Sequence, residues 1–293
     1  MTADILQSET RAEIKAASGV EIAQDHEALL DNIMQTHTLE GQGAFWWLGQ
    51  HTFIVKAGGK VFYIDPWLAD WESRQTSRLL IPQEAKHADF ALITHGHGDH
   101  LCPETLPHMA LASPDALFVC PRTEAHRMQE EGNVPLERLS PLNAGETLEL
   151  DGVKITAIKA RHENFDEHST LGFPYLGYVI EVGGVIVYHA GDTILYEGLR
   201  ATLAQWPRLD VMFLPINGRD AERYLRDCFG NMTFQEAVEL AGDLKAGLAV
   251  PAHYDMFVGN QEDPEKFIRF LNAKYPGVPS WVGKAGERVF FGV

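Results

Sequence analysis

The stretch THGHGDH, residues 94–100, places three histidines and one aspartate within six residues directly after an apolar run. His95 and His97 are two residues apart, so side chains leaving the end of a strand can converge on one cation. Asp99 and His100 can then turn toward a second cation. Imidazole nitrogen and carboxylate oxygen suit zinc, manganese or iron, and the two glycines allow a tight turn. A histidine-rich turn arising by chance is the alternative, and the spacing favours a metal-binding loop.

Three further residues stand where additional ligands are needed, because the loop alone cannot complete two metal sites. His162, Asp192 and His253 each come just after an apolar, strand-like run. A lone histidine is more often a structural residue with a satisfied hydrogen bond. Three residues that all follow predicted strands favour metal ligation instead.

The apolar pattern predicts short strands in two groups, each accompanied by helices. Strands are expected at 44–48, 52–56, 61–64, 90–94, 153–157, 178–182, 185–189, 211–214, 248–250 and 288–291. Helices are expected at 27–37, 104–111, 122–131, 233–245 and 264–274. Gly183 and Gly184 indicate a hairpin turn, and Thr233 with Glu236 indicates a helix capping box. We therefore expect an α+β fold of two packed sheets with helices outside, comprising a helical extension over 1–43 and one domain over 44–293.

Composition restricts the class of partner. Lysine and arginine number 24 against 41 aspartates and glutamates, a formal charge of −17. Such a surface repels a phosphate backbone, so no nucleic-acid substrate is expected. No apolar run approaches the ~18–20 residues of a membrane helix, and the N-terminus lacks the order of a signal peptide. We expect a cytoplasmic protein without a membrane partner, in which Cys102, Cys120 and Cys228 are buried thiols.

The order H-x-H-x-D-H, then His, Asp and His, resembles the metallo-β-lactamase superfamily over residues 44–260. The resemblance implies that superfamily's αββα sandwich of two mixed β-sheets flanked by helices, with a catalytic domain over 44–293. It also implies two divalent metal ions, zinc or manganese, with iron as a further option. By position, the first metal takes His95, His97 and His162, the second takes Asp99, His100 and His253, and Asp192 bridges them.

Three segments resemble more narrowly the branch that contains L-ascorbate-6-phosphate lactonase. These are AFWWLGQH at 44–51, YIDPW at 63–67 and VYHAGDT at 187–193. The resemblance implies a metal-dependent hydrolase that uses a metal-bridging hydroxide on a small, anionic, sugar-derived lactone. It also suggests a homo-oligomer. The segment 215–226 departs from the lactonase pattern, which leaves the substrate open.

The two-metal reading assigns roles to the residues around the ligands. Asp99 is the candidate for orienting the nucleophile and passing its proton to the leaving group. Asp65 and His189 are candidates for supporting the ligands through hydrogen bonds; a strand-ending turn and a core histidine are the plainer alternatives. For substrate binding we select residues of the 49–51 hairpin tip and the departing loop: His51, Asn217 and Arg219. A solvated helix face is the preferred reading of Arg223 and Arg226.

Other functions share the same ligand pattern. A phosphodiesterase acting on a small phosphodiester is the main alternative, because two metals also suit phosphoryl transfer. A nuclease is disfavoured by the acidic charge. A non-enzymatic binding protein is disfavoured because every expected ligand position is filled.

Overall fold

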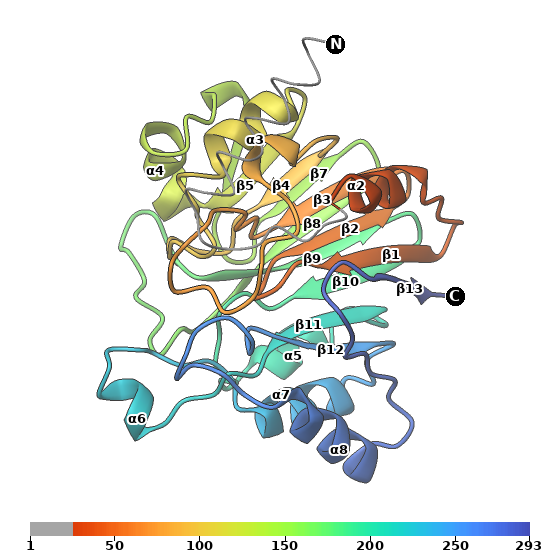
Figure 1. Cartoon of the computed structure of the whole chain (residues 1–293). Coiled ribbons are helices and arrows are strands. Elements are labelled where there is room, and N and C mark those ends of the chain that lie inside the picture. Colours follow the sequence, from red (N-terminus) through yellow and green to blue (C-terminus); the bar gives the residue numbers. More distant parts are fainter. Residues whose placement is uncertain (1–25) are drawn as a thin grey trace.

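Two β-sheets pack face to face in the computed structural model, which describes residues 26–293. Helices cover the outer side of each sheet (Figure 1). Each sheet contains both parallel and antiparallel pairs. The predicted αββα sandwich of two mixed sheets is therefore confirmed.

The first sheet has seven strands in the order β13-β1-β2-β3-β4-β5-β6. From β13 through β1 and β2 to β3, neighbouring strands pair antiparallel. From β3 through β4 and β5 to β6, they pair parallel. The strands are β1 (Gln42–Trp47), β2 (Phe53–Ala57), β3 (Lys60–Ile64), β4 (Phe90–Leu92), β5 (Leu117–Pro121), β6 (Leu139–Leu142) and β13 (Arg288–Gly292).

The second sheet has six strands in the order β12-β11-β10-β9-β8-β7. They are β7 (Thr147–Leu150), β8 (Val153–Lys159), β9 (Leu176–Val182), β10 (Val185–His189), β11 (Val211–Pro215) and β12 (Ala249–Ala252). Gly183 and Gly184, both with positive φ, join β9 to β10 as the predicted hairpin turn.

The helices lie outside the sheets. They are α2 (His26–Gln35), α3 (Leu106–Ala112), α4 (Ala125–Glu130), α5 (Leu199–Leu203), α6 (Ala221–Tyr224), α7 (Phe234–Asp243) and α8 (Pro264–Lys274). Single 3₁₀ turns lie at Pro82–Glu84, Arg122–Glu124 and Leu136–Arg138. Thr233 and Glu236 form the predicted capping box at the start of α7.

Alternating side chains on β1 explain how this strand joins two cores. Phe45 and Trp47 point between the sheets, where Phe45 meets Phe213 of β11 at 5.1 Å between ring centroids. Trp46 points to the opposite face, toward the helices, and its indole donates to Asn32 of α2 at 2.9 Å. The strand is therefore buried on both faces. This explains why residues 44–47 are all apolar and do not alternate with polar residues.

Three strands were missing from the sequence prediction, and two of them are sheet edges. β6 contains Pro141, and all of β7 except one half-buried residue is exposed. Edge strands bury little, tolerate proline and so lose the apolar signal. The helix expected at 122–131 is also shorter, because its first turn is the 3₁₀ turn before α4.

The predicted extension over 1–43 is only partly described. Residues 1–25 lie outside the described residues, and β1 begins at Gln42. The predicted helix at 27–37 is α2, whose Leu29 and Ile33 are buried in the core beside the first sheet. Within residues 26–293, no helix has the length and apolar character needed to cross a membrane.

Candidate metal centre

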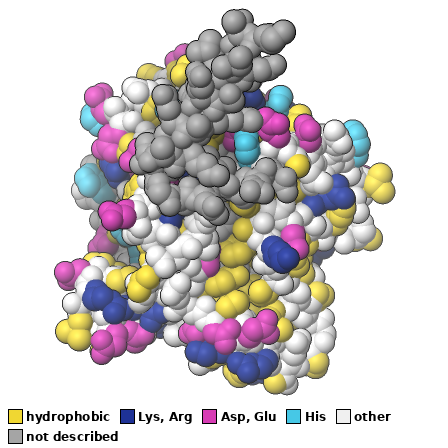
Figure 2. All heavy atoms as spheres, in the orientation of Figure 1, with side chains coloured by type: hydrophobic (Ala, Val, Ile, Leu, Met, Phe, Trp, Pro, Cys, Tyr) yellow, Lys and Arg dark blue, Asp and Glu magenta, His cyan; other side chains and the backbone are white. Residues whose placement is uncertain are grey.

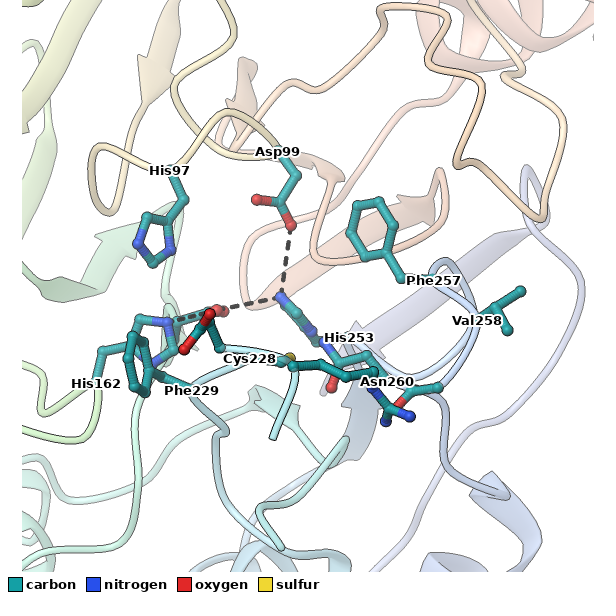
Figure 3. Close-up of a pocket in the computed structure, with 13 residues that line it drawn as sticks. His97, Asp99, His162, Cys228, Phe229, His253, Phe257, Val258 and Asn260 are labelled. Carbon is teal, nitrogen blue, oxygen red and sulfur yellow. Dashed lines mark hydrogen bonds and ion pairs between the residues drawn. The ribbon is translucent and has the colours of Figure 1, made fainter. Parts of the chain in front are cut away.

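The predicted ligands leave the sandwich at the carboxyl ends of four strands. The loop 94–100 follows β4, His162 follows β8, Asp192 follows β10 and His253 follows β12. These ends meet along one edge of the paired sheets. The structure thus brings together residues separated by more than 150 positions in the chain, and Figure 3 shows four of them around one pocket.

The ligands form two groups that touch at one carboxylate. Ligand atoms of His95, His97, His162 and Asp192 all lie within 4.8 Å of one another, as do those of Asp99, His100 and His253.

Asp192 also reaches the second group. Its Oδ2 lies 3.1 Å from His253 Nε2 and 3.7 Å from His162 Nε2. Its Oδ1 lies 3.5 Å from His100 Nε2. Asp192 therefore stands between the two groups, where a bridging ligand has to stand.

The donor atoms fit divalent cations. His100 Nε2 and Asp192 Oδ1 are buried and have no hydrogen-bond partner among the described residues. Buried polar atoms without partners are costly, and a cation at this place would satisfy them. The two groups supply imidazole nitrogens and carboxylate oxygens, a set compatible with zinc, manganese and iron.

The electrostatics of the cluster favour the same conclusion. Burial lowers the pKa of His162 to about 4 and that of His95 well below its usual value, so both imidazoles are neutral, as ligands must be. His100 behaves differently: burial lowers its pKa, but the surrounding carboxylates, Asp192 first, outweigh burial and raise it to about 10. The carboxylates of Asp192, Asp99 and Asp65 thus favour a positive charge at this position, which a cation bound at Nε2 would supply in place of the proton.

Asp65, the predicted support of the candidate ligands, is hydrogen-bonded to residues of the loop 94–100. The carboxylate is fully buried and accepts from the Thr94 backbone N–H at 2.8 Å and from the Thr94 hydroxyl at 2.7 Å. Its Oδ2 also lies 2.7 Å from His100 Nδ1. The imidazole is thereby oriented with Nε2 toward Asp99 and Asp192.

Gln50 is a site residue that sequence reasoning missed. Its side-chain amide donates to Asp99 Oδ2 at 2.8 Å, and its backbone carbonyl accepts from the His253 backbone N–H at 2.9 Å. Gln50 and His253 both have positive φ, a conformation uncommon for residues with side chains and concentrated at functional sites. The only sequence signal was the position of Gln50 at a hairpin tip beside His51.

Arg127 of α4 contacts the candidate metal-binding loop, residues 94–100, from outside. Its guanidinium donates to the Gly96 carbonyl at 2.6 Å and is itself paired with Glu124 and Glu131. A Cβ at Gly96 would lie 2.8 Å from Arg127 Nη1, and one at Gly98 would lie 2.5 Å from the Trp71 ring. Neither glycine has positive φ, so the loop requires glycine for space rather than for a tight turn.

Replacing Arg127 with methionine is expected to weaken metal binding about three- to tenfold, because one charge-assisted hydrogen bond to the loop is lost. The measurement is a competition titration with a metal-chelating dye. Arg122→Met is the matched control, since Arg122 pairs with Glu146 rather than with the loop. Equal losses in the two variants would contradict a specific role for Arg127.

His51 and His189 lie behind the ligands rather than in the pocket. Both are fully buried, their ring centroids are 4.1 Å apart, and His51 Nδ1 lies 3.5 Å from Asp192 Oδ1. Burial lowers the pKa of His51 to about 4 and that of His189 to about 3. Both imidazoles are therefore neutral. This position of His51 differs from the predicted substrate contact, because the hairpin tip folds inward beneath Asp192.

The pocket over the candidate metal ligands has a volume of about 490 Å³, a size suited to a small molecule. Figure 3 shows its lining residues, which come from the candidate ligands and from two loops that follow α6 and β12. The complete lining is His97, Asp99, His162, Asp192, Arg226, Asp227, Cys228, Phe229, His253, Phe257, Val258, Gly259 and Asn260.

Cys102 and Cys120 are buried, whereas Cys228 is only half-buried, which corrects the expectation of three buried thiols.

The two substrate contacts predicted in the departing loop are not in this lining. Arg219 forms a two-fold ion pair with Glu236, at 2.6 Å for each bond. Asn217 is buried and hydrogen-bonded to Asn231 and Asn260. The arginine that reaches the pocket is Arg226, which the alternating charges had indicated as part of a solvated face.

Comparison with known proteins agrees with the geometry. The family described as Beta-lactamase superfamily domain matches residues 60–254. A UPF0173 metal-dependent hydrolase of Thermococcus onnurineus is 33% identical over 235 residues, which cover 78% of this chain and 91% of that relative. A second, from Methanoculleus marisnigri, is 32% identical over 228 residues, 77% of this chain and 87% of the relative.

The fold is shared with Igni18, a metallo hydrolase from the archaeon Ignicoccus hospitalis, with a TM-score of 0.69 and 24% identity. That alignment covers 86% of this chain and 99% of Igni18. The family match spans both ligand groups, from β3 to His253. The chain belongs to the metallo-β-lactamase superfamily and, within it, to the UPF0173 family of metal-dependent hydrolases.

Proposed function

We propose that this metal-dependent hydrolase is lactonase-like and opens a small, anionic, sugar-derived lactone with the help of two divalent cations. The observation that carries the proposal is Asp192, which stands between two ligand groups at the base of a pocket. The resemblance of segments 44–51, 63–67 and 187–193 to the ascorbate-6-phosphate lactonase branch supports the lactone.

The ligand assignment follows the two groups. His95, His97 and His162 would hold the first cation, and Asp99, His100 and His253 the second, with Asp192 shared between them. Bound there, the pair would lower the pKa of a shared water and polarise a substrate carbonyl. Neutral imidazoles on the first cation would leave that activating charge undiminished, whereas the carboxylates of Asp99 and Asp192 would offset part of it.

Asp99 is suited to orient the attacking water and to return its proton to the leaving oxygen. It lines the pocket, and only one of its oxygens, Oδ2, is held by Gln50. The other oxygen is free of hydrogen bonds among the described residues. In a lactone the leaving oxygen stays tethered to the product, so a proton delivered by Asp99 completes ring opening to a hydroxy acid.

The test is hydrolysis of a panel of sugar lactones and their phosphates by protein loaded with zinc, manganese or iron in turn. We expect turnover of at least one anionic lactone with one metal, and about two equivalents of that metal per chain. In a His95→Ala variant we expect the turnover to be lost and the metal content to be reduced. A fully metallated protein that leaves the whole panel intact would exclude the lactonase while leaving the metal assignment standing.

A phosphodiesterase acting on a small phosphodiester remains the second candidate, because a pair of cations bridged by a carboxylate also suits an in-line attack at phosphorus. Bis(p-nitrophenyl) phosphate distinguishes the two. Turnover above the metal-only blank, combined with inert lactones, would favour the phosphodiesterase.

A further inference from the structure

Two buried asparagines, Asn231 and Asn217, and the half-buried Asn260 form a relay that ends at the pocket wall. Asn231 Nδ2 donates to Asn217 Oδ1 at 3.1 Å, and Asn217 Nδ2 donates to Asn260 Oδ1 at 2.9 Å. Arg223 Nε also donates to Asn260 Oδ1, at 3.1 Å. An arginine N–H can only donate, so the atom of Asn260 that faces it must be the oxygen.

The orientation of Asn260 leaves its amide nitrogen without an acceptor. Within residues 26–293, neither N–H group of Asn260 Nδ2 donates a hydrogen bond, and Asn260 is part of the pocket lining. Figure 3 shows Asn260 on the His253 side of the pocket, with His97 and His162 across from it. The buried relay beneath fixes this donor in place before any ligand arrives, which lowers the entropic cost of binding.

Arg226 adds a charge to the same wall. One of its nitrogens donates to the Gly259 carbonyl at 2.7 Å, so the guanidinium is anchored to the residue before Asn260. A Cβ at Gly259 would lie 2.9 Å from the guanidinium carbon, so glycine gives the room that this approach requires. A guanidinium has five N–H donors, and those not used on Gly259 remain for a ligand.

We propose that Arg226 and Asn260 form a subsite for a second anionic group of the substrate, a carboxylate or a phosphate, while the metal-binding residues take the group that is hydrolysed. The part of this proposal that places the hydrolysed group at the metals rests on the proposed function. A charged donor beside a fixed amide matches an oxyanion, and Arg is the side chain best suited to carboxylate and phosphate.

The remaining lining adds one further negative charge and three apolar side chains. Asp227 is the one carboxylate of the lining that is not a candidate metal ligand, and it is exposed to solvent. Phe229, Phe257 and Val258 supply apolar surface that displaces water when a ligand enters. Lower local dielectric strengthens a charge-assisted hydrogen bond. Recognition can therefore be local, although the whole chain carries a charge of −17.

Three sugar acids test the subsite without turnover: gluconate, glucarate and 6-phosphogluconate. They share a carboxylate for the metal side and carry at the far end no anion, a second carboxylate or a phosphate. Binding to metal-loaded protein is measured by titration calorimetry. Glucarate and 6-phosphogluconate are termed dianions for their two anionic groups, although the phosphate alone carries about −1.5 to −2 at neutral pH. We expect at least one of these two acids to bind about tenfold more tightly than gluconate, as a charge-assisted hydrogen bond predicts, and the better one identifies the anion class.

Variants separate the subsite from the metals. Arg226→Gln should abolish the preference for the dianion and leave the gluconate Kd within about twofold. Asn260→Asp keeps an oxygen toward Arg223 but replaces the donor with a carboxylate, so it should weaken dianion binding at least tenfold. Arg269→Gln, on an arginine whose side chain is 72% exposed on α8, is the matched control and should change nothing.

Equal affinity for all three acids, binding of none, or a dianion preference that survives Arg226→Gln would overturn the subsite. Because no turnover is measured, an inactive lactone panel with intact dianion preference would instead reject only the proposed reaction.

Discussion

Replacing Asp192 with asparagine is expected to reduce the metal content from about two equivalents per chain to one or fewer, and to reduce kcat/KM about a thousandfold. Asp192 is the candidate carboxylate that lies between the two groups. Its Oδ2 is 3.7 Å from His162 Nε2 and 3.1 Å from His253 Nε2, and its Oδ1 is 3.5 Å from His100 Nε2. An amide keeps the shape but removes the charge that offsets two cations. Several kcal/mol of charge stabilisation are lost, and each 1.4 kcal/mol is a factor of ten.

Elemental analysis gives the metal content independently of any substrate, and kcat/KM is measured on whichever substrate the protein turns over. Asp210→Asn is the matched control. Asp210 is also a buried carboxylate next to a strand of the second sheet, β11, but it accepts from the Ile186 backbone and pairs with Arg208, away from the candidate ligands. If the Asp192→Asn protein retained two metals and full activity, the assignment of Asp192 as a bridging ligand would be wrong.

That the candidate ligands lie close together could be predicted from the sequence, because the signal for it is local. His162, Asp192 and His253 each follow a buried strand whose apolar run is visible in the sequence. In a sandwich of this kind, the carboxyl ends of such strands meet at one edge, so position along each strand implies position in space. The same logic fails for β7, which is an edge strand with an almost fully exposed burial pattern and no apolar run to reveal it.

The residues around the ligands were harder to predict because their roles depend on long-range contacts. Arg219 and Arg226 are seven positions apart in one charged segment, and nothing local distinguishes them. Glu236 captures the first through a two-fold ion pair, while Gly259 accepts from the second and holds it at the pocket. Gln50 was missed for the same reason, since its partner Asp99 is 49 residues away.

Replacing Asp65 with alanine should lower the free energy of unfolding of the metal-free protein by about 3–5 kcal/mol, the cost of breaking a buried ion pair. The substitution leaves three groups without their acceptor: the Thr94 amide, the Thr94 hydroxyl and His100 Nδ1. All are fully buried, so water cannot replace the carboxylate. Asp65 also has φ of 46°, a conformation that aspartate tolerates better than alanine.

Urea denaturation in the presence of a chelator measures this loss apart from any loss of metal. Asp65→Asn should cost less than alanine, because its amide oxygen can still accept from Thr94 while its NH₂ faces His100. Asp115→Ala, at an exposed position, should change stability by no more than about 0.5 kcal/mol. If Asp65→Ala were as stable as this control, the carboxylate would not hold the ligand loop, and His100 would owe its orientation to the metal alone.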